Sequence, residues 1–69
     1  MNATDIKKHL NKQVRYKNQK TGVDKPYMLT GAIFRKNADG FYYQAELQDL
    51  QNNRSIVICS LNDIEPIEQ

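Results

Sequence analysis

Cysteine and histidine are nearly absent from this 69-residue chain, which has one of each, Cys59 and His9. A single cysteine excludes an intramolecular disulfide, whereas small secreted domains usually depend on several. The lone thiol fits a reducing compartment, so we expect a cytoplasmic protein. Structural zinc sites need four such ligands, and these two stand fifty positions apart. We therefore predict no metal and no cofactor.

Glycine and long apolar runs are also scarce. None of the three glycines forms a phosphate-binding loop, because each stands alone: Gly22, Gly31 and Gly40. The longest apolar runs, 32–34 and 56–59, are far shorter than the roughly 20 residues of a membrane helix, so we expect no membrane contact. Cys59 lies in an apolar stretch, where a thiol usually packs as a small hydrophobic group. We predict no catalytic residue and no enzyme activity.

Charge is divided unevenly along the chain. Ten basic and eight acidic residues give a formal net charge of +2. Residues 1–36 carry nine basic and two acidic side chains, a net of +7, and residues 37–69 carry one and six, a net of −5. Such a division marks either a charged binding face or electrostatic pairing between the two halves.

The alternation of apolar and polar residues predicts a mainly β domain with one short helix. We expect the helix over 4–11, capped by Thr4 or Asp5. Strands are expected over 13–17, 27–36, 41–50, 55–61 and around 64–67. The connections are a loop over 18–26, tight turns over 37–40 and 51–54, and a single helical turn that begins at Ser60.

A chain this short has room for one domain, over residues 1–69. Five strands joined mostly by tight turns predict a small five-stranded antiparallel barrel over 13–67, with the helix in front of it. Gly31 falls within the second strand, which indicates a bulge or sharp bend there.

Three segments of the chain resemble the Sm-like proteins, which are SH3-like small β-barrels. Ile6 and Leu10 followed by 11–14 resemble their passage from helix to first strand. The segment 29–33 resembles their second strand, and 56–66 resembles their closing strand, turn and last strand. The resemblance implies an SH3-like barrel that assembles into a ring and binds single-stranded RNA. The two RNA-pocket motifs of that family are absent, from 35–40 and 59–61, so no binding residue is transferred from it.

Basic residues interleave with aromatic ones in the first two strands and the loop between them. Such a surface can hold phosphates by charge and stack bases on rings, although Tyr16, Tyr27 and Phe34 can equally be core residues. Pairing of 27–36 with 41–50 would place part of the positive charge beside Glu46 and Asp49. We therefore expect the uncompensated positive surface, the predicted nucleic-acid site, to comprise Lys8, Lys12, Arg15, Lys17, Lys20 and Lys25.

The leading hypothesis is a small non-enzymatic module that binds single-stranded RNA or DNA through this basic face. The alternative is a protein–protein interaction (adaptor) module with no nucleic-acid role. It would use the loop over 18–26 and the outward row Tyr42, Gln44, Glu46 and Gln48. A third reading is a homo-oligomer that assembles through an open strand edge. A compact accessory protein of bacterial or phage origin fits all three hypotheses.

Overall fold

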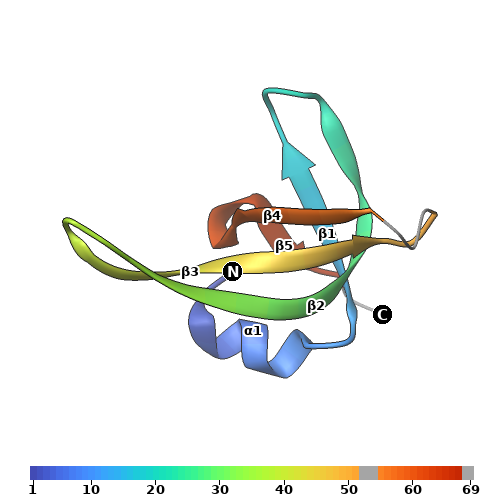
Figure 1. The fold of residues 1–69 in the computed structure, drawn as a ribbon. Helices are drawn as coiled ribbons and strands as arrows, with labels where there is room; N and C mark the ends of the chain where they lie inside the picture. The colour runs from blue at the N-terminus through green and yellow to red at the C-terminus, as the bar shows by residue number, and fades with distance from the viewer. Residues whose placement is uncertain (52–54, 68–69) are drawn as a thin grey trace.

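The computed structural model describes residues 1–51 and 55–67, which form one antiparallel sheet preceded by one short helix (Figure 1). The helix is α1 (Ala3–His9). The strands are β1 (Gln13–Asn18), β2 (Val23–Asn37), β3 (Gly40–Asp49), β4 (Ile56–Ser60) and β5 (Ile64–Pro66). A 3-10 turn, η1 (Leu61–Asp63), joins β4 to β5. The predicted mainly β class with an N-terminal helix is confirmed.

The sheet is open, so the predicted closure into a barrel is wrong. Its strand order is β4-β3-β2-β1-β5, and no ladder joins β4 to β5 within the described ranges. Closure fails because β5 has only three residues, all paired with β1, and ends at Pro66, which has no N–H to donate. The curved sheet is bridged instead by η1, which contacts both β1 and β3.

The predicted loop over 18–26 is much shorter in the structure, because β2 begins at Val23. Asn18 directs the turn with its side-chain oxygen, which accepts from the backbone N–H of Lys20 at 3.0 Å. Pro26 is tolerated inside β2 because only β1 pairs with the strand there, and the ladder with β3 begins at Tyr27. The predicted turn over 37–40 is confirmed, and the one over 51–54 falls largely outside the described residues.

The helix begins at Ala3, one residue earlier than predicted, and its N-cap is Asn2 and not Thr4 or Asp5. The Asn2 side chain accepts from the backbone N–H of Asp5 at 2.8 Å, which satisfies one of the free amides of the first turn. The helix ends at His9, and Asn11 follows with a positive φ of 65°. The N–H of Asn11 donates to the Leu29 carbonyl at 2.7 Å, which fixes α1 against β2.

The core is shared by one face of the sheet and α1. Nine residues are buried there: Ile6, Val14, Tyr16, Tyr27, Leu29, Ala45, Leu47, Cys59 and Ile64. They come from all five strands and α1, so the described chain shares a single core. Tyr16 and Tyr27 meet edge to face, with ring centroids 5.4 Å apart, a favoured geometry for buried aromatic pairs.

The hairpin of β2 and β3 projects beyond the rest of the sheet (Figure 1). β4 pairs with β3 only from Gln44 onward, so no third strand supports the hairpin tip in the part that the structure describes. The predicted bulge is confirmed, since the register shifts between Leu29 and Gly31. A Cβ at Gly31 would lie 3.0 Å from Oε2 of Glu46, so the end of that side chain would have to shift slightly to make room for any other residue at this bend.

Candidate functional site

Two of the predicted binding residues, Arg15 and Lys17, are already paired with carboxylates. They point to the same face of β1, between Asp24 on β2 and Glu65 on β5. Arg15 Nη1 lies 3.4 Å from Asp24 Oδ1, and Lys17 Nζ lies 2.9 Å from Glu65 Oε1. The hydrogen bond with Lys17 lowers the pKa of Glu65, and the same bond raises the pKa of Lys17.

Lys25 is paired as well. Its Nζ lies 3.0 Å from Asp49 Oδ2 and 5.2 Å from the centroid of the Tyr27 ring. The hydrogen bond with Asp49 raises the pKa of Lys25. The expectation that Arg15, Lys17 and Lys25 are uncompensated is therefore wrong. It missed that Asp24 and Glu65 flank β1 and that β2 begins early enough to bring Lys25 to Asp49 on β3.

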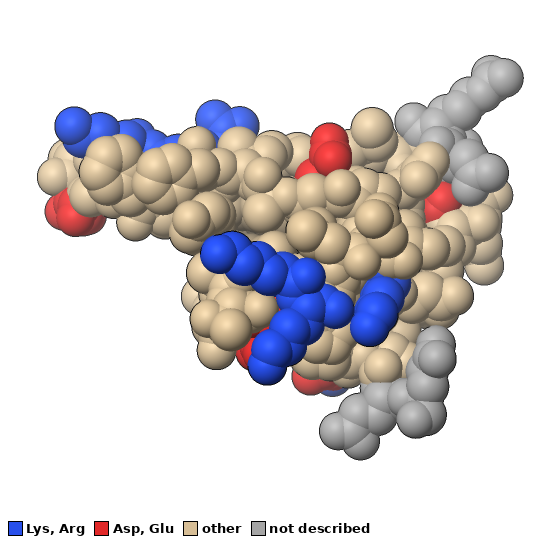
Figure 2. Space-filling view, turned by 90° about the horizontal axis from the view of Figure 1, so that it is seen from below, with Lys and Arg blue, Asp and Glu red and all other residues tan. Residues whose placement is uncertain are grey.

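The positive charge without carboxylate partners gathers instead on the side of α1. Lys7 and Lys8 on α1 and Lys12 just after it are exposed, and none forms an ion pair with any described residue. Figure 2, which looks onto this side, shows basic side chains grouped there and further basic groups along the hairpin. We call Lys7, Lys8 and Lys12 the α1 lysine cluster.

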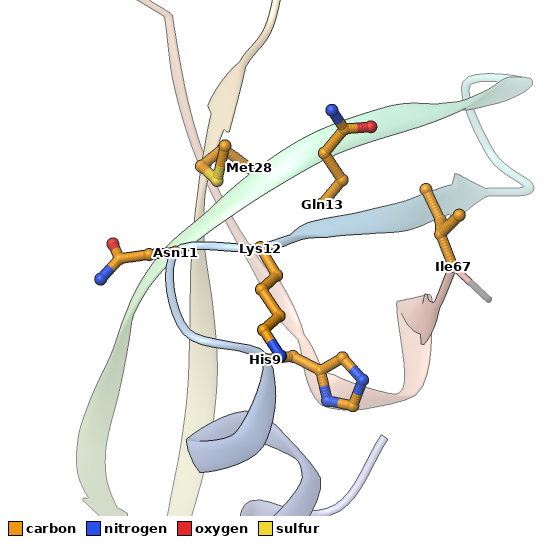
Figure 3. Close-up of a pocket in the computed structure, with 6 residues that line it drawn as sticks. All are labelled: His9, Asn11, Lys12, Gln13, Met28 and Ile67. Carbon is orange, nitrogen blue, oxygen red and sulfur yellow. The ribbon is translucent and has the colours of Figure 1, made fainter. Parts of the chain in front are cut away.

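An open hollow adjoins this cluster (Figure 3). It has a volume of about 440 Å³ and is lined by His9, Asn11, Lys12, Gln13, Met28 and Ile67. His9 is half-buried, and its Nδ1 lies 2.7 Å from the Asp5 carbonyl oxygen. Because a carbonyl can only accept, Nδ1 carries the proton and Nε2 of the neutral ring is the acceptor. The lining contains Lys12 as its only charged side chain, so the hollow extends the basic surface.

Lys20 stands apart from the cluster. It lies in the β1–β2 turn, at the opposite end of the molecule from α1 (Figure 1), and lines a hollow that also contains Asp63. The six predicted residues therefore do not form one surface. Lys8 and Lys12 lie in the α1 lysine cluster, the three paired residues lie along β1 and β2, and Lys20 is separate. Sequence reasoning left out Lys7, although its place beside Lys8 was a usable signal.

The aromatic residues of the first two strands are divided between the core and the surface. Tyr16 and Tyr27 are buried, as the core reading predicts, but Phe34 is 58% exposed on the hairpin. Arg35 and Lys36 are also exposed there and form no ion pair with a described residue, although strand pairing was expected to compensate them. The carboxylates of β3 that were expected to do so, Glu46 and Asp49, lie opposite Gly31 and Tyr27 instead.

Neither the thiol nor the acidic residues form a site with obvious chemistry. Burial raises the pKa of the Cys59 thiol to about 11, and the nearby Asp63 carboxylate adds to the rise, so the thiolate is scarce at neutral pH. No group of three or more histidine, cysteine and acidic side chains suited to a metal ion occurs among residues 1–51 and 55–67. In the same residues no helix has the length and apolar character to cross a membrane.

Comparison of the chain with protein families, with curated proteins and with solved structures finds no match. The resemblance to Sm-like proteins is therefore supported only at the level of a small antiparallel β fold with an N-terminal helix.

Proposed function

We propose that this chain is a non-enzymatic module that binds single-stranded RNA or DNA, with the α1 lysine cluster as its phosphate-binding surface. The observation that carries the proposal is the position of Lys7, Lys8 and Lys12, three exposed ammonium groups without a carboxylate partner among the described residues. When such ammonium groups replace the counterions condensed on the phosphates of a nucleic acid, the release of those ions favours binding.

The paired cations have a different part in this proposal. A phosphate that approached Arg15 or Lys17 would have to displace Asp24 or Glu65, and would meet the repulsion of that carboxylate. These residues and Lys25 instead hold β1, β2, β3 and β5 together through cross-strand pairs. Of the six residues predicted from the sequence, Lys8 and Lys12 therefore remain in the proposed site.

The test is a titration of the protein into labelled single-stranded RNA and DNA of mixed sequence, over a range of salt concentrations. We expect binding at low salt that weakens steadily as salt rises, because phosphate contacts release counterions. Absence of binding to both oligonucleotides at low salt would overturn the proposal.

A second candidate function, protein recognition on the opposite face of the sheet, is favoured by one observation. Ile56 and Ile58 on the edge strand β4 are 61% and 43% exposed and lie beside Gln48 and Glu46 of the predicted outward row. A protein partner on this face would be lost on Ile58→Lys and retained on Lys8→Gln. Affinity purification with both variants distinguishes this function from nucleic-acid binding.

A further inference from the structure

Three aromatic rings form an exposed row on one face of the projecting hairpin. Phe34 stacks on Phe41 with ring centroids 4.9 Å apart and an interplanar angle of 10°. Phe34 also contacts Tyr43, with centroids 5.0 Å apart. The exposed fractions are 58% for Phe34, 65% for Phe41 and 42% for Tyr43. We call these three residues the hairpin ring row.

The row is exposed because the hairpin extends beyond the core. Tyr43, Ala45 and Leu47 alternate along β3 and therefore share one face, and Ala45 and Leu47 are fully buried. The same apolar face continues outward over Tyr43, which borders α1 across a groove and is 42% exposed, and over Phe41, which is 65% exposed. Apolar surface of this kind usually marks a place where a partner binds.

Charge around the row indicates an anionic partner. Lys36, which pairs with Phe41 and shares the face of the row, has its Nζ 5.6 Å from the centroid of the Phe41 ring, whereas Arg35 pairs with Tyr42 on the opposite face. Asp39 in the turn is the single acidic residue between 34 and 43. Flat rings beside unpaired cations are the combination with which proteins hold single strands, because bases stack on rings while phosphates pair with cations.

The row is also continuous with the α1 lysine cluster. Tyr43 lines a groove of about 320 Å³ together with Lys7 and Leu10 from the α1 side and Ala32 from β2. A ligand held by its phosphates at α1 would therefore reach the rings across this groove.

We propose that the hairpin ring row stacks the unpaired bases of a single strand of RNA or DNA, and so gives the module a preference for single strands over duplex. This inference rests on the proposed function and names the ligand class of that surface. In a duplex the base faces are already stacked on one another, so rings on a protruding strand face have no base to contact. The α1 lysine cluster alone would bind either form through its phosphates.

The test compares the wild-type protein with Phe34→Thr/Phe41→Thr, in which threonine keeps a strand-forming residue at both exposed positions. Its matched control is Tyr42→Thr, on the opposite face of β3 and 39% exposed. Each protein is titrated into a single strand, a duplex of the same sequence, and an abasic strand that has the phosphates but no bases.

We expect the double variant to bind the single strand at least about tenfold more weakly than wild type, since each stacked base contributes a factor of that order. Its binding to the duplex and the abasic strand should be unchanged, and Tyr42→Thr should behave as wild type. If wild type binds all three nucleic acids equally, or the double variant keeps the single-strand preference, this inference is wrong while the proposed function stands. If wild type binds none of them, both fail. Light scattering tests whether the row is covered instead by a second copy of the chain. If the wild type is a dimer and Phe34→Thr/Phe41→Thr is a monomer, the row is a dimer interface and the inference is overturned.

Discussion

Replacing two cations by glutamine at either of two places on the surface tests what governs nucleic-acid binding: the position of the cations or the net charge of the protein. One variant is Lys7→Gln/Lys8→Gln, which removes two lysines of the α1 lysine cluster. The other is Arg15→Gln/Lys17→Gln, which removes two cations paired with Asp24 and Glu65. Each leaves eight basic and eight acidic residues, so both change the formal net charge from +2 to zero.

The size of the expected difference follows from counterion release. Each phosphate contact on a single strand contributes about 0.7 to the slope of log affinity against log salt. Loss of Lys7 and Lys8 should therefore reduce the slope by about 1.4, and between about 50 and about 200 mM salt the wild type should lose about 7-fold more affinity than this variant. Arg15 and Lys17 are already matched by carboxylates, so their removal should leave the slope close to that of wild type.

Fluorescence anisotropy of a labelled single strand at several salt concentrations measures both slopes, and circular dichroism checks that each variant remains folded. Identical slopes for the two variants would refute the reasoning, since they would mean that only the net charge of the protein matters. A larger change for Arg15→Gln/Lys17→Gln would return the binding site to β1, as the sequence alone predicted.

Three further predictions concern the fold. Leu47 is fully buried, so Leu47→Ala should lower the free energy of unfolding, measured by urea denaturation, by about 2–5 kcal/mol. In so small a domain a loss of this size leaves much of the population unfolded. The raised pKa of Cys59, about 11 against about 8.5 for an unfolded thiol, should make its alkylation at about pH 8 at least about 100-fold slower in the native protein than in denaturant. A native rate equal to the denatured rate would contradict the burial. Because Lys17 lowers the pKa of Glu65 in the folded state, the pair stabilises the fold above the unfolded pKa of about 4.3 and loses that effect as pH falls below it. The stability difference between wild type and Glu65→Gln should therefore shrink from about pH 6 to about pH 3, and a constant difference would show that the pair does not contribute.

The sequence predicted the local elements well, because their signals are short-range. The turn at 37–40 follows from Asn37 and Gly40, and the η1 cap follows from Ser60, whose oxygen accepts from the Asn62 amide at 3.2 Å. The predictions were wrong where the structure of a segment depends on residues far away in the chain. The strand β2 extends through the polar stretch from Val23 because β1 pairs with it there, and pattern alone favoured a loop.

The candidate site was predicted only in part, for a related reason. Lys8 and Lys12 remain in it, but Arg15 and Lys17 are paired with carboxylates that stand nine and 48 residues away in the chain. The alternation that placed Tyr42 in the outward row of β3, and so its neighbour Tyr43 on the opposite face with Ala45 and Leu47, was correct. It could not show that the core ends before this residue, because the extent of the core depends on where α1 and β4 stop covering the hairpin.

The sequence by itself determined that this is a short, mainly β chain with one thiol, one helix and a strongly divided charge, since those properties are set by composition and near neighbours. The tertiary structure decided that the sheet stays open, which cations are compensated and which rings are exposed. Those properties depend on cross-strand register and on the edge of the core, where residues far apart in the chain either meet a partner or are left in water.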